Sequence, residues 1–156
     1  MANDKLKHIV RVANTDLKGD KQIVYALTKI KGVGNNFANF VCCAANINKQ
    51  KKAGALNDSE VEMLNKVIAD PISHGAPTWL LNRQKDYDTG EDKHLILGKL
   101  TFQQETDVKR MMKTKSYRGL RHHWKLPLRG QRTRSNFRKS KGKGLGVQRK
   151  KKGGKK

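Results

Sequence analysis

Cysteine, proline, tryptophan and acidic residues are all scarce in this sequence. Its 156 residues include two Cys, three Pro and two Trp, and 13 Asp and Glu stand against 35 Lys and Arg, which gives a formal net charge of +22. Cys42 and Cys43 are adjacent, and adjacent cysteines seldom bridge each other, so we expect no disulfide framework. We expect a reducing compartment, in which both thiols act as small buried hydrophobic side chains.

Long apolar runs are absent as well. No stretch approaches the roughly 18 uninterrupted apolar residues of a membrane-spanning helix. The opening residues, "MANDKLKHIV", show no pattern of a secretory signal. The basic end of the chain has no amphipathic apolar face that would lie on an anionic bilayer. We therefore expect no membrane partner.

Acidic residues are confined to the first part of the chain. The last 44 residues, from Lys113 on, hold 18 Lys and Arg and no acid, whereas the other 112 residues hold 17 basic and 13 acidic residues, a net of +4. The last part cannot bury enough apolar surface to offset chain entropy, and its charges repel one another. A polyanion would cancel this repulsion and gain entropy from released counterions. Nucleic acid is therefore the expected partner.

Apolar spacing predicts mainly helical structure before the basic end. Residues 8–17 alternate as in a short strand or an extended arm. Helices are expected over residues 20–30, 35–47 and 58–70, the last capped by Asp58 or Ser59 and ended by Pro71. Residues 78–100 place two apolar patches around a polar turn, which suggests a loose β-hairpin. We expect Trp79 and Leu80 in this segment to be core residues.

The chain divides into four parts on this basis. These are an N-terminal arm and globular core (1–77), a hairpin-like insertion (78–100), a long helix followed by a short one (101–126), and an extended basic tail (127–156). Thr101 is a possible cap for the long helix. No internal repeat is present.

Two segments are candidates for binding phosphate. The first is "TKIKGVGNNFA" (28–38), where Gly32 and Gly34 permit a tight turn and close approach of another molecule, and the next helix presents unpaired N–H groups. A plain helix–helix turn with solvated lysines accounts for the same spacing, and both interpretations remain open. A nearby basic loop, "NKQKKAGALN", adds further lysines.

The second element is the stretch "LRHHWKLPLRGQRTRSNFRK" (120–139) together with the basic residues after it. Arginine binds phosphate through a planar fork, and flat His and Trp rings stack on unpaired RNA bases. The alternative is a solvated solubility tail, which would not need arginine interleaved with aromatic residues. The basic residues could also form a nuclear-import signal, which would add to nucleic-acid binding without replacing it. The candidate nucleic-acid contacts are Lys29, Lys31, Gly32, Gly34, Lys49, Lys51, Lys52, Arg118, Arg121, His122, His123, Trp124, Lys125, Arg129, Gln131, Arg132, Thr133, Arg134 and Arg138.

Other chemistries have little support. His122 and His123 lack the spacing of metal ligands and lie among cations, so no metal is expected. The stretch "GKGLGVQ" lacks the spacing of a phosphate-binding loop, and no cofactor is expected. No Ser/His/Asp or Cys/His set is suggested by spacing, so we expect a protein that is not an enzyme.

Three segments together resemble a known family. "LTKIKGVGNNFA", "WLLNRQKD" and "YRGLRHHWKLPLRGQRTR", in this order and before a lysine-rich end, are similar to the small-subunit ribosomal protein called S thirteen in bacteria and S eighteen in eukaryotes. The similarity runs from about His8 to Lys152. "TWLLNRQKD" resembles an insertion of archaeal and eukaryotic members, which favours a eukaryotic cytosolic ribosome. The stretch after Thr133 departs from the Thr- and Gly-rich run of eukaryotic relatives.

The resemblance implies a fold, a role and partners. The fold is mainly α, with a helix-two-turn-helix core, a small β insertion, a long helix and an extended tail. The role is a structural constituent of the small-subunit head that binds rRNA, contributes to an inter-subunit bridge and reaches toward P-site transfer RNA. Implied protein partners are a neighbouring S nineteen family member and a large-subunit L five family member. The tail residues implied to lie near transfer RNA are Arg149, Lys150, Lys151 and Lys152.

Two other functions are compatible with a basic helical protein. Helix-two-turn-helix elements occur in DNA glycosylases, although those enzymes begin with a catalytic proline and usually carry a zinc finger, and this chain has neither feature. A chromatin-type DNA-condensing protein would bind duplex without regard to sequence. The ribosomal function places the protein in the cytoplasm, with assembly in the nucleolus if the source is eukaryotic.

Overall fold

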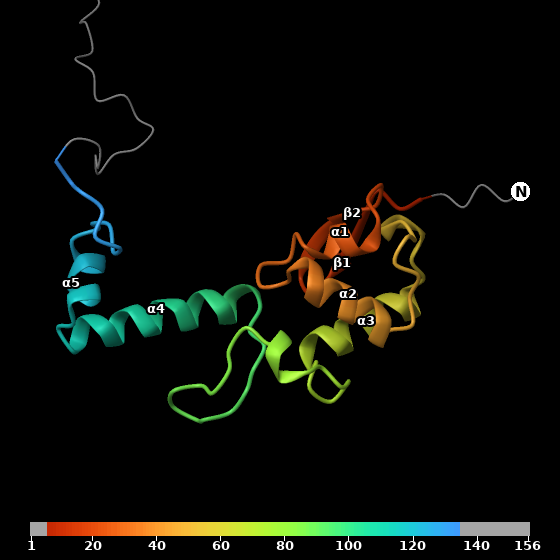
Figure 1. The fold of residues 1–156 in the computed structure, drawn as a ribbon. Helices are drawn as coiled ribbons and strands as arrows, with labels where there is room; N and C mark the ends of the chain where they lie inside the picture. Colours follow the sequence, from red (N-terminus) through yellow and green to blue (C-terminus); the bar gives the residue numbers. More distant parts are fainter. Residues whose placement is uncertain (1–5, 135–156) are drawn as a thin grey trace, which may run out of the picture. The chain divides into compact units, whose positions relative to one another are not determined.

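The computed structural model describes residues 6–134, and the chain forms two compact units, Met1–Gln103 and Gln104–Lys156. Helices dominate, and the described sheet has two strands (Figure 1). The elements are β1 (Ile9–Val12), β2 (Thr15–Lys18), α1 (Ile23–Leu27), α2 (Asn35–Ala44), the 3-10 turn η1 (Ala53–Ala55), α3 (Asp58–Ala69), the 3-10 turn η2 (Thr78–Leu80), α4 (Leu97–Lys113) and α5 (Tyr117–His123). This composition confirms the predicted mainly helical fold class.

Strands β1 and β2 form an antiparallel hairpin where one strand or arm was expected. Val12 pairs with Thr15 across a two-residue turn. Ala13 and Asn14 in that turn have φ of 44° and 57°, the left-handed conformation that matches the twist of the strands. The backbone N–H of Ala13 also donates to Oδ1 of Asn65 on α3 at 2.8 Å. The turn therefore depends partly on a side chain 52 residues away.

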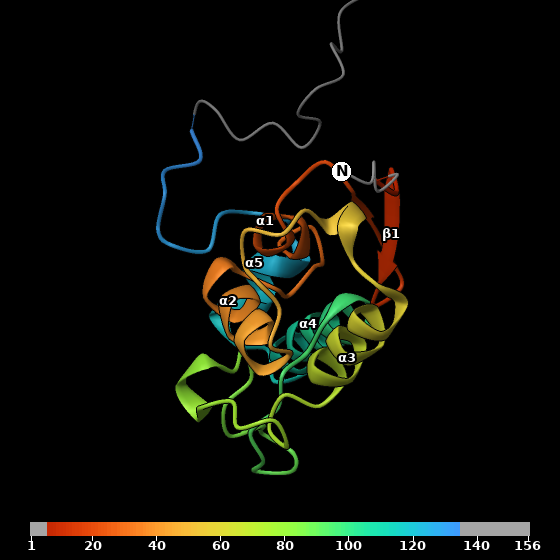
Figure 2. The ribbon, with the colours of Figure 1, turned by 90° about the vertical axis from the view of Figure 1, so that its right-hand side faces the viewer.

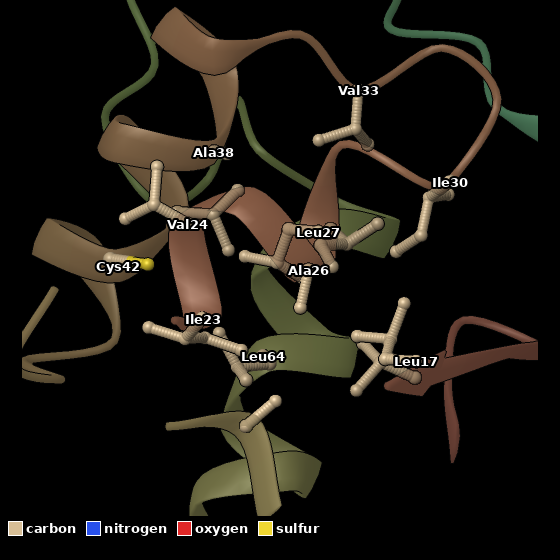
Figure 3. Close-up of a cluster of buried hydrophobic side chains, with 14 of the residues drawn as sticks. Leu17, Ile23, Val24, Ala26, Leu27, Ile30, Val33, Ala38, Cys42 and Leu64 are labelled. Carbon is tan, nitrogen blue, oxygen red and sulfur yellow. The ribbon is translucent and has the colours of Figure 1, made fainter. Parts of the chain in front are cut away.

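The core of the first unit lies between the hairpin and helices α1, α2 and α3 (Figures 2 and 3). Leu17, Ile23, Leu27 and Leu64 are almost completely buried and come from β2, α1 and α3. Apolar side chains recurring every three or four residues place one face of each helix against this cluster. Burying them supplies most of the driving force for folding this unit.

The two cysteines have different environments. Cys42 faces the core, and burial, assisted by the neighbouring Cys43 thiol and opposed by Lys49, raises its pKa to about 11. Cys43 is exposed, so the expectation that both thiols are buried is wrong for this residue. Consecutive residues on a helix point about 100° apart, so they do not share one narrow buried face.

The start of α3 is fixed by a residue preceding those that were expected to cap it. The N-cap is Asn57, whose backbone N–H donates to Oε2 of Glu60 at 2.8 Å. Burial raises the pKa of Glu60, but hydrogen bonds from Lys51 and the Asn57 amide, with the charge of Lys51, hold it below the ordinary value. The lowered pKa means that this arrangement stabilises the fold above the ordinary pKa of Glu60. That stabilisation is lost as pH falls through the lower folded value.

Between η2 and α4 the predicted hairpin is a loop closed by one β-bridge, between Arg83 and Lys93, and two paired strands do not form. The Asn82 side chain also bonds both backbone polar groups of Leu95, at 2.7 and 2.8 Å. Inside the loop, Asp86 pairs with Arg83 at 2.9 Å, and this hydrogen bond is the main reason that the pKa of Asp86 is lowered. The insertion is therefore held by polar side chains instead of a backbone ladder.

Two expectations about the ends of this insertion are wrong. Trp79 is 71% exposed, so it does not belong to the core, whereas Leu80 is partly buried against it. Helix α4 begins at Leu97, so Thr101 lies inside the helix, and its hydroxyl donates to the carbonyl of Leu97 at 3.2 Å. A hydroxyl bonded to the preceding turn is a common alternative to capping.

In the second unit, the end of α4 packs against α5. Ser116 caps α5 and accepts a hydrogen bond from the N–H of Gly119 at 3.2 Å. Gly119 is buried, and a Cβ at this position would collide with the carbonyl group of Met111. The sequence "YRGLRHH" thus forms the predicted short helix, and its glycine permits close contact with the preceding helix.

Candidate nucleic-acid interface

The two glycines of the Gly-x-Gly turn have different roles. Gly32 has φ of 103°, and a Cβ there would lie 2.6 Å from the carbonyl oxygen of Leu95. The next element is tied to the same place, because the N–H of Leu97 donates to the carbonyl of Lys31 at 2.8 Å. Gly32 therefore serves the packing of the protein itself.

Gly34 has the open position that an approaching molecule needs. It is the N-cap of α2, its φ is −95°, and no atom lies within 4 Å of where a Cβ would stand. No side chain caps the helix there, so the amides of the first turn retain hydrogen-bonding capacity. Gly32 therefore fits the interpretation of a packed helix–helix turn, whereas Gly34 remains a predicted RNA contact.

Lys29 and Lys31 are not gathered at the start of α2. Nζ of Lys29 donates to the backbone carbonyl of Asp16 at 2.5 Å, and Nζ of Lys31 donates to Oγ1 of Thr101 at 3.0 Å. Exposed contacts of this kind are weak and are exchanged readily for a phosphate. Both lysines therefore remain candidates for RNA contact.

The basic loop between α2 and η1 contains one structural lysine and two exposed ones. Lys51 pairs with Glu60 at 2.7 Å with its side chain 28% exposed, and its carbonyl accepts from the N–H of Ile23 at 2.9 Å. Lys49 and Lys52 are exposed. Of the three predicted RNA contacts in this loop, Lys51 has a demonstrated role within the fold, and the other two face outward.

Tyr25 is a candidate that the sequence pattern did not suggest. It is 61% exposed and lies with Asn35, Asn39 and Lys49 around an open hollow of about 310 Å³. The hollow brings an aromatic ring, two amides and a cation beside the start of α2. The apolar periodicity of the α1 segment identified only its buried residues. The signal that could have identified Tyr25 is an aromatic residue on the opposite face of that helix.

Helix α5 gathers four of the predicted site residues with Tyr117. Arg118 and His123 are exposed, and His122 is half-buried. Nε of Arg121 donates to the carbonyl of Pro127 at 2.8 Å, and its guanidinium lies 5.9 Å from the centre of the Tyr117 ring. This bond uses one of the five N–H groups of the guanidinium, so Arg121 fixes the chain after the helix and retains donors for phosphate.

The chain after α5 presents its polar side chains outward. Trp124 is 51% exposed. The N–H of Leu126 donates to the carbonyl of Arg121 at 3.0 Å, and the N–H of Arg129 donates to Oε1 of Gln131 at 3.0 Å, next to Gly130 with φ of 74°. The exposed predicted contacts here are Lys125, Arg129, Gln131, Arg132, Thr133 and Arg134.

The formally charged side chains of residues 113–134 are all positive. It contains eight Lys and Arg and no acid. Within residues 6–134, no arginine of this stretch forms an ion pair with a carboxylate. Such a surface attracts a polyanion and offers forks that suit phosphate. The predicted contacts Arg138, Arg149, Lys150, Lys151 and Lys152 lie outside the described residues.

Neither a metal site nor a membrane span is found in the described part of the chain. Residues 6–134 contain no cluster of three or more His, Cys, Asp or Glu side chains suited to holding a metal ion. In that range, no helix combines the length and the apolar character needed to cross a bilayer.

Comparison with known proteins gives the family. Residues 11–139 match the family described as ribosomal protein S13/S18. The chain belongs to the ribosomal protein S13/S18 family. It is 45% identical over 148 residues to small ribosomal subunit protein uS13 of Methanothermobacter thermautotrophicus, covering 95% of this chain and 98% of the relative. It is 44% identical over 152 residues to uS13 of Methanocaldococcus jannaschii, covering 97% and 100%.

Membership of the S13/S18 family settles two of the expectations. The resemblance drawn from the three motifs is confirmed, and the archaeal relatives fit the expected eukaryotic-type member. The family is one of structural ribosomal proteins, so the protein is not an enzyme, and the DNA-glycosylase alternative is excluded.

Proposed function

We propose that this protein is a structural constituent of the small ribosomal subunit and binds small-subunit rRNA. The supporting observation is the stretch 113–134, where eight exposed or half-exposed basic residues occur without any acid. Its arginines lack carboxylate partners within the described chain, so phosphate groups can satisfy them. Family membership makes rRNA the polyanion to expect.

The two units contribute differently to this function. The packed core presents the open start of α2 with Lys49 nearby, which suits positioning against an RNA backbone. The arginine-rich stretch after α5 (residues 128–134) has few hydrogen bonds within the described chain, and we expect it to adapt to the contour of the surrounding RNA. In this mechanism, binding is electrostatic and shape-based, and it involves no catalytic step.

The finer assignments rest on the family resemblance. We place the protein in the head of the subunit, beside an S nineteen family protein and across an inter-subunit bridge from an L five family protein. The tail containing Arg149–Lys152 would reach toward P-site transfer RNA. The protein would work in the cytoplasm, with nucleolar assembly in a eukaryote.

The salt dependence of RNA binding tests this proposal. If about eight phosphates are neutralised, affinity for small-subunit rRNA should fall by roughly 10³- to 10⁵-fold between 50 and 200 mM salt. Filter binding of the full chain over a salt series measures this slope. A duplex DNA competitor of equal charge should displace the rRNA poorly. Equal affinity for both nucleic acids would instead favour a chromatin-type protein and contradict the proposal.

A further inference from the structure

The exposed residue Trp79 lines an open hollow next to the start of α2. The open hollow has a volume of about 560 Å³ and is lined by Trp79 and Leu80 of η2, by residues of the Gly-x-Gly turn and first turn of α2, and by Asn82 and His94. Trp79 is 71% exposed. Tyr87, Phe102 and Tyr25 of the same unit are 74%, 69% and 61% exposed, but of these four aromatic residues only Trp79 lines this hollow. Exposure of so much indole surface to water is unfavourable unless something covers it.

The position of Trp79 is held by the backbone. The 3-10 turn η2 is closed by hydrogen bonds from Leu80 N–H to the Pro77 carbonyl at 3.0 Å and from Leu81 N–H to the Thr78 carbonyl at 3.1 Å. Leu81 is buried and Leu80 packs on the core, so the turn is anchored next to the tryptophan. The indole therefore projects from a fixed support, which reduces the entropy cost of stacking on it.

Two stacked rings form part of the lining of the hollow. The rings of Phe37 and His94 stack with centroids 3.7 Å apart and planes 9° from parallel. Burial lowers the pKa of His94, and the nearby Gly32 backbone opposes this only in part, so the buried site disfavours the charged form of the ring. Both ring nitrogens are buried and have no hydrogen-bond partner among the described residues. The stack acts as a wall and is not an exposed binding group.

The side chains that line the hollow are uncharged, and their chemistry indicates what kind of group could bind there. None of the described residues around it is Lys, Arg, Asp or Glu. Asn35 and Asn36 are exposed, and their side chains make no hydrogen bond within the described chain. The uncapped backbone amides at the start of α2 suit the phosphate of a nucleotide, whereas the indole of Trp79 and the side-chain amides suit its base, which is neutral, flat and edged with hydrogen-bonding groups. Lys49 lines the adjacent hollow together with Asn35, so a cation lies next to this site.

We infer that an unpaired base of small-subunit rRNA enters this hollow and stacks on Trp79, with the amides of Asn35 and Asn36 at its edge. The inference rests on the proposed rRNA binding and adds a base-stacking site to it. The site lies on the packed unit, and the arginine-rich stretch contributes no residue to it. The stacking contribution should be independent of salt, because the indole and the base carry no charge.

The fluorescence of Trp79 tests the inference directly. Since the chain has two tryptophans, Trp124→Phe leaves Trp79 as the single emitter and keeps a flat ring at position 124. Isolated small-subunit rRNA, added to this full-length variant, should quench Trp79 and lower its accessibility to acrylamide severalfold. If the rRNA binds in a filter assay while Trp79 stays accessible, the base-stacking site is wrong and rRNA binding stands. If neither this variant nor the unsubstituted chain binds rRNA in that assay, the proposed function fails as well.

Substitution of Trp79 provides the second measurement. Trp79→Ala should weaken rRNA binding by about tenfold, whereas Trp79→Phe should retain most of the affinity. The slope of affinity against salt should be unchanged in both, unlike the effect of removing an arginine. Tyr87→Ala, another exposed aromatic residue of the same unit, is the matched control and should bind normally. Protection of Trp79 that appears only in the complete subunit, and not with rRNA alone, would indicate a protein neighbour and overturn the inference.

Discussion

Replacing both Arg129 and Arg132 by glutamate should prevent the protein from entering small ribosomal subunits. Both side chains are exposed and have no carboxylate partner in the described chain. A hydrogen bond to a charged group contributes about 1.5–3 kcal/mol, so losing two should lower rRNA affinity by roughly 100-fold or more. The introduced carboxylates add repulsion from phosphate. Sedimentation of tagged protein from cell extracts should show it at the top of the gradient.

A control variant with the same change in net charge distinguishes the effect of where the charges lie from the effect of net charge alone. Lys18→Glu with Lys66→Glu reverses two lysines, on β2 and α3, that are outside the predicted interface. This variant should still co-sediment with small subunits, with only a modest loss of affinity. Equal loss of incorporation in the two double variants would mean that total charge governs binding, and would contradict the assignment of Arg129 and Arg132.

Gly32→Ala should destabilise the first unit by about 2–4 kcal/mol, a large fraction of the stability of a small domain. A side chain at φ of 103° is strained, and its Cβ would press within 2.6 Å of the Leu95 carbonyl oxygen. The two effects act together because the close contact prevents the backbone from relaxing to a more favourable φ. Denaturant unfolding followed by circular dichroism measures the change.

Gly34→Ala is the matched control in the same turn. Gly34 has an ordinary φ and open space around it, so the free energy of unfolding should fall by less than about 1 kcal/mol, mainly from a poorer N-cap. The methyl group would nevertheless stand where RNA is proposed to approach. If Gly34→Ala destabilised the protein as much as Gly32→Ala, the distinction between a packing glycine and an interface glycine would be wrong.

Local periodicity was sufficient to predict the helices but not their surroundings. The face of α2 could be predicted from the spacing of Phe37, Phe40 and Val41, because a helix brings residues three and four apart together. The hairpin was missed because its turn uses Ala13 and Asn14 in the left-handed region without a glycine to signal it. Such turns are decided by contacts that are distant in sequence, here the bond to Asn65.

The charge of the predicted interface could be predicted from the sequence, whereas the contacts made by its individual residues could not. The basic stretch was evident from composition, since a run of arginines without acids is typical of nucleic-acid binding. The pairing of Lys51 with Glu60 was not evident, because the intervening chain had to fold first. Similarly, the difference between Gly32 and Gly34 depends on Leu95, which lies far along the chain. The exposure of Trp79 contradicted the expectation that it packs in the core.

Amide hydrogen exchange of the full chain, alone and bound to small-subunit rRNA, is the most direct test that the arginine-rich stretch is completed by RNA. In residues 128–134, the one hydrogen bond found for a backbone amide is the local bond from Arg129 to Gln131, so these amides should exchange rapidly in the free protein. On binding rRNA they should become strongly protected, while amides in the core of α2 and α3 change little. Rapid exchange of residues 128–134 in the rRNA complex, or protection of them in the free protein, would contradict the account.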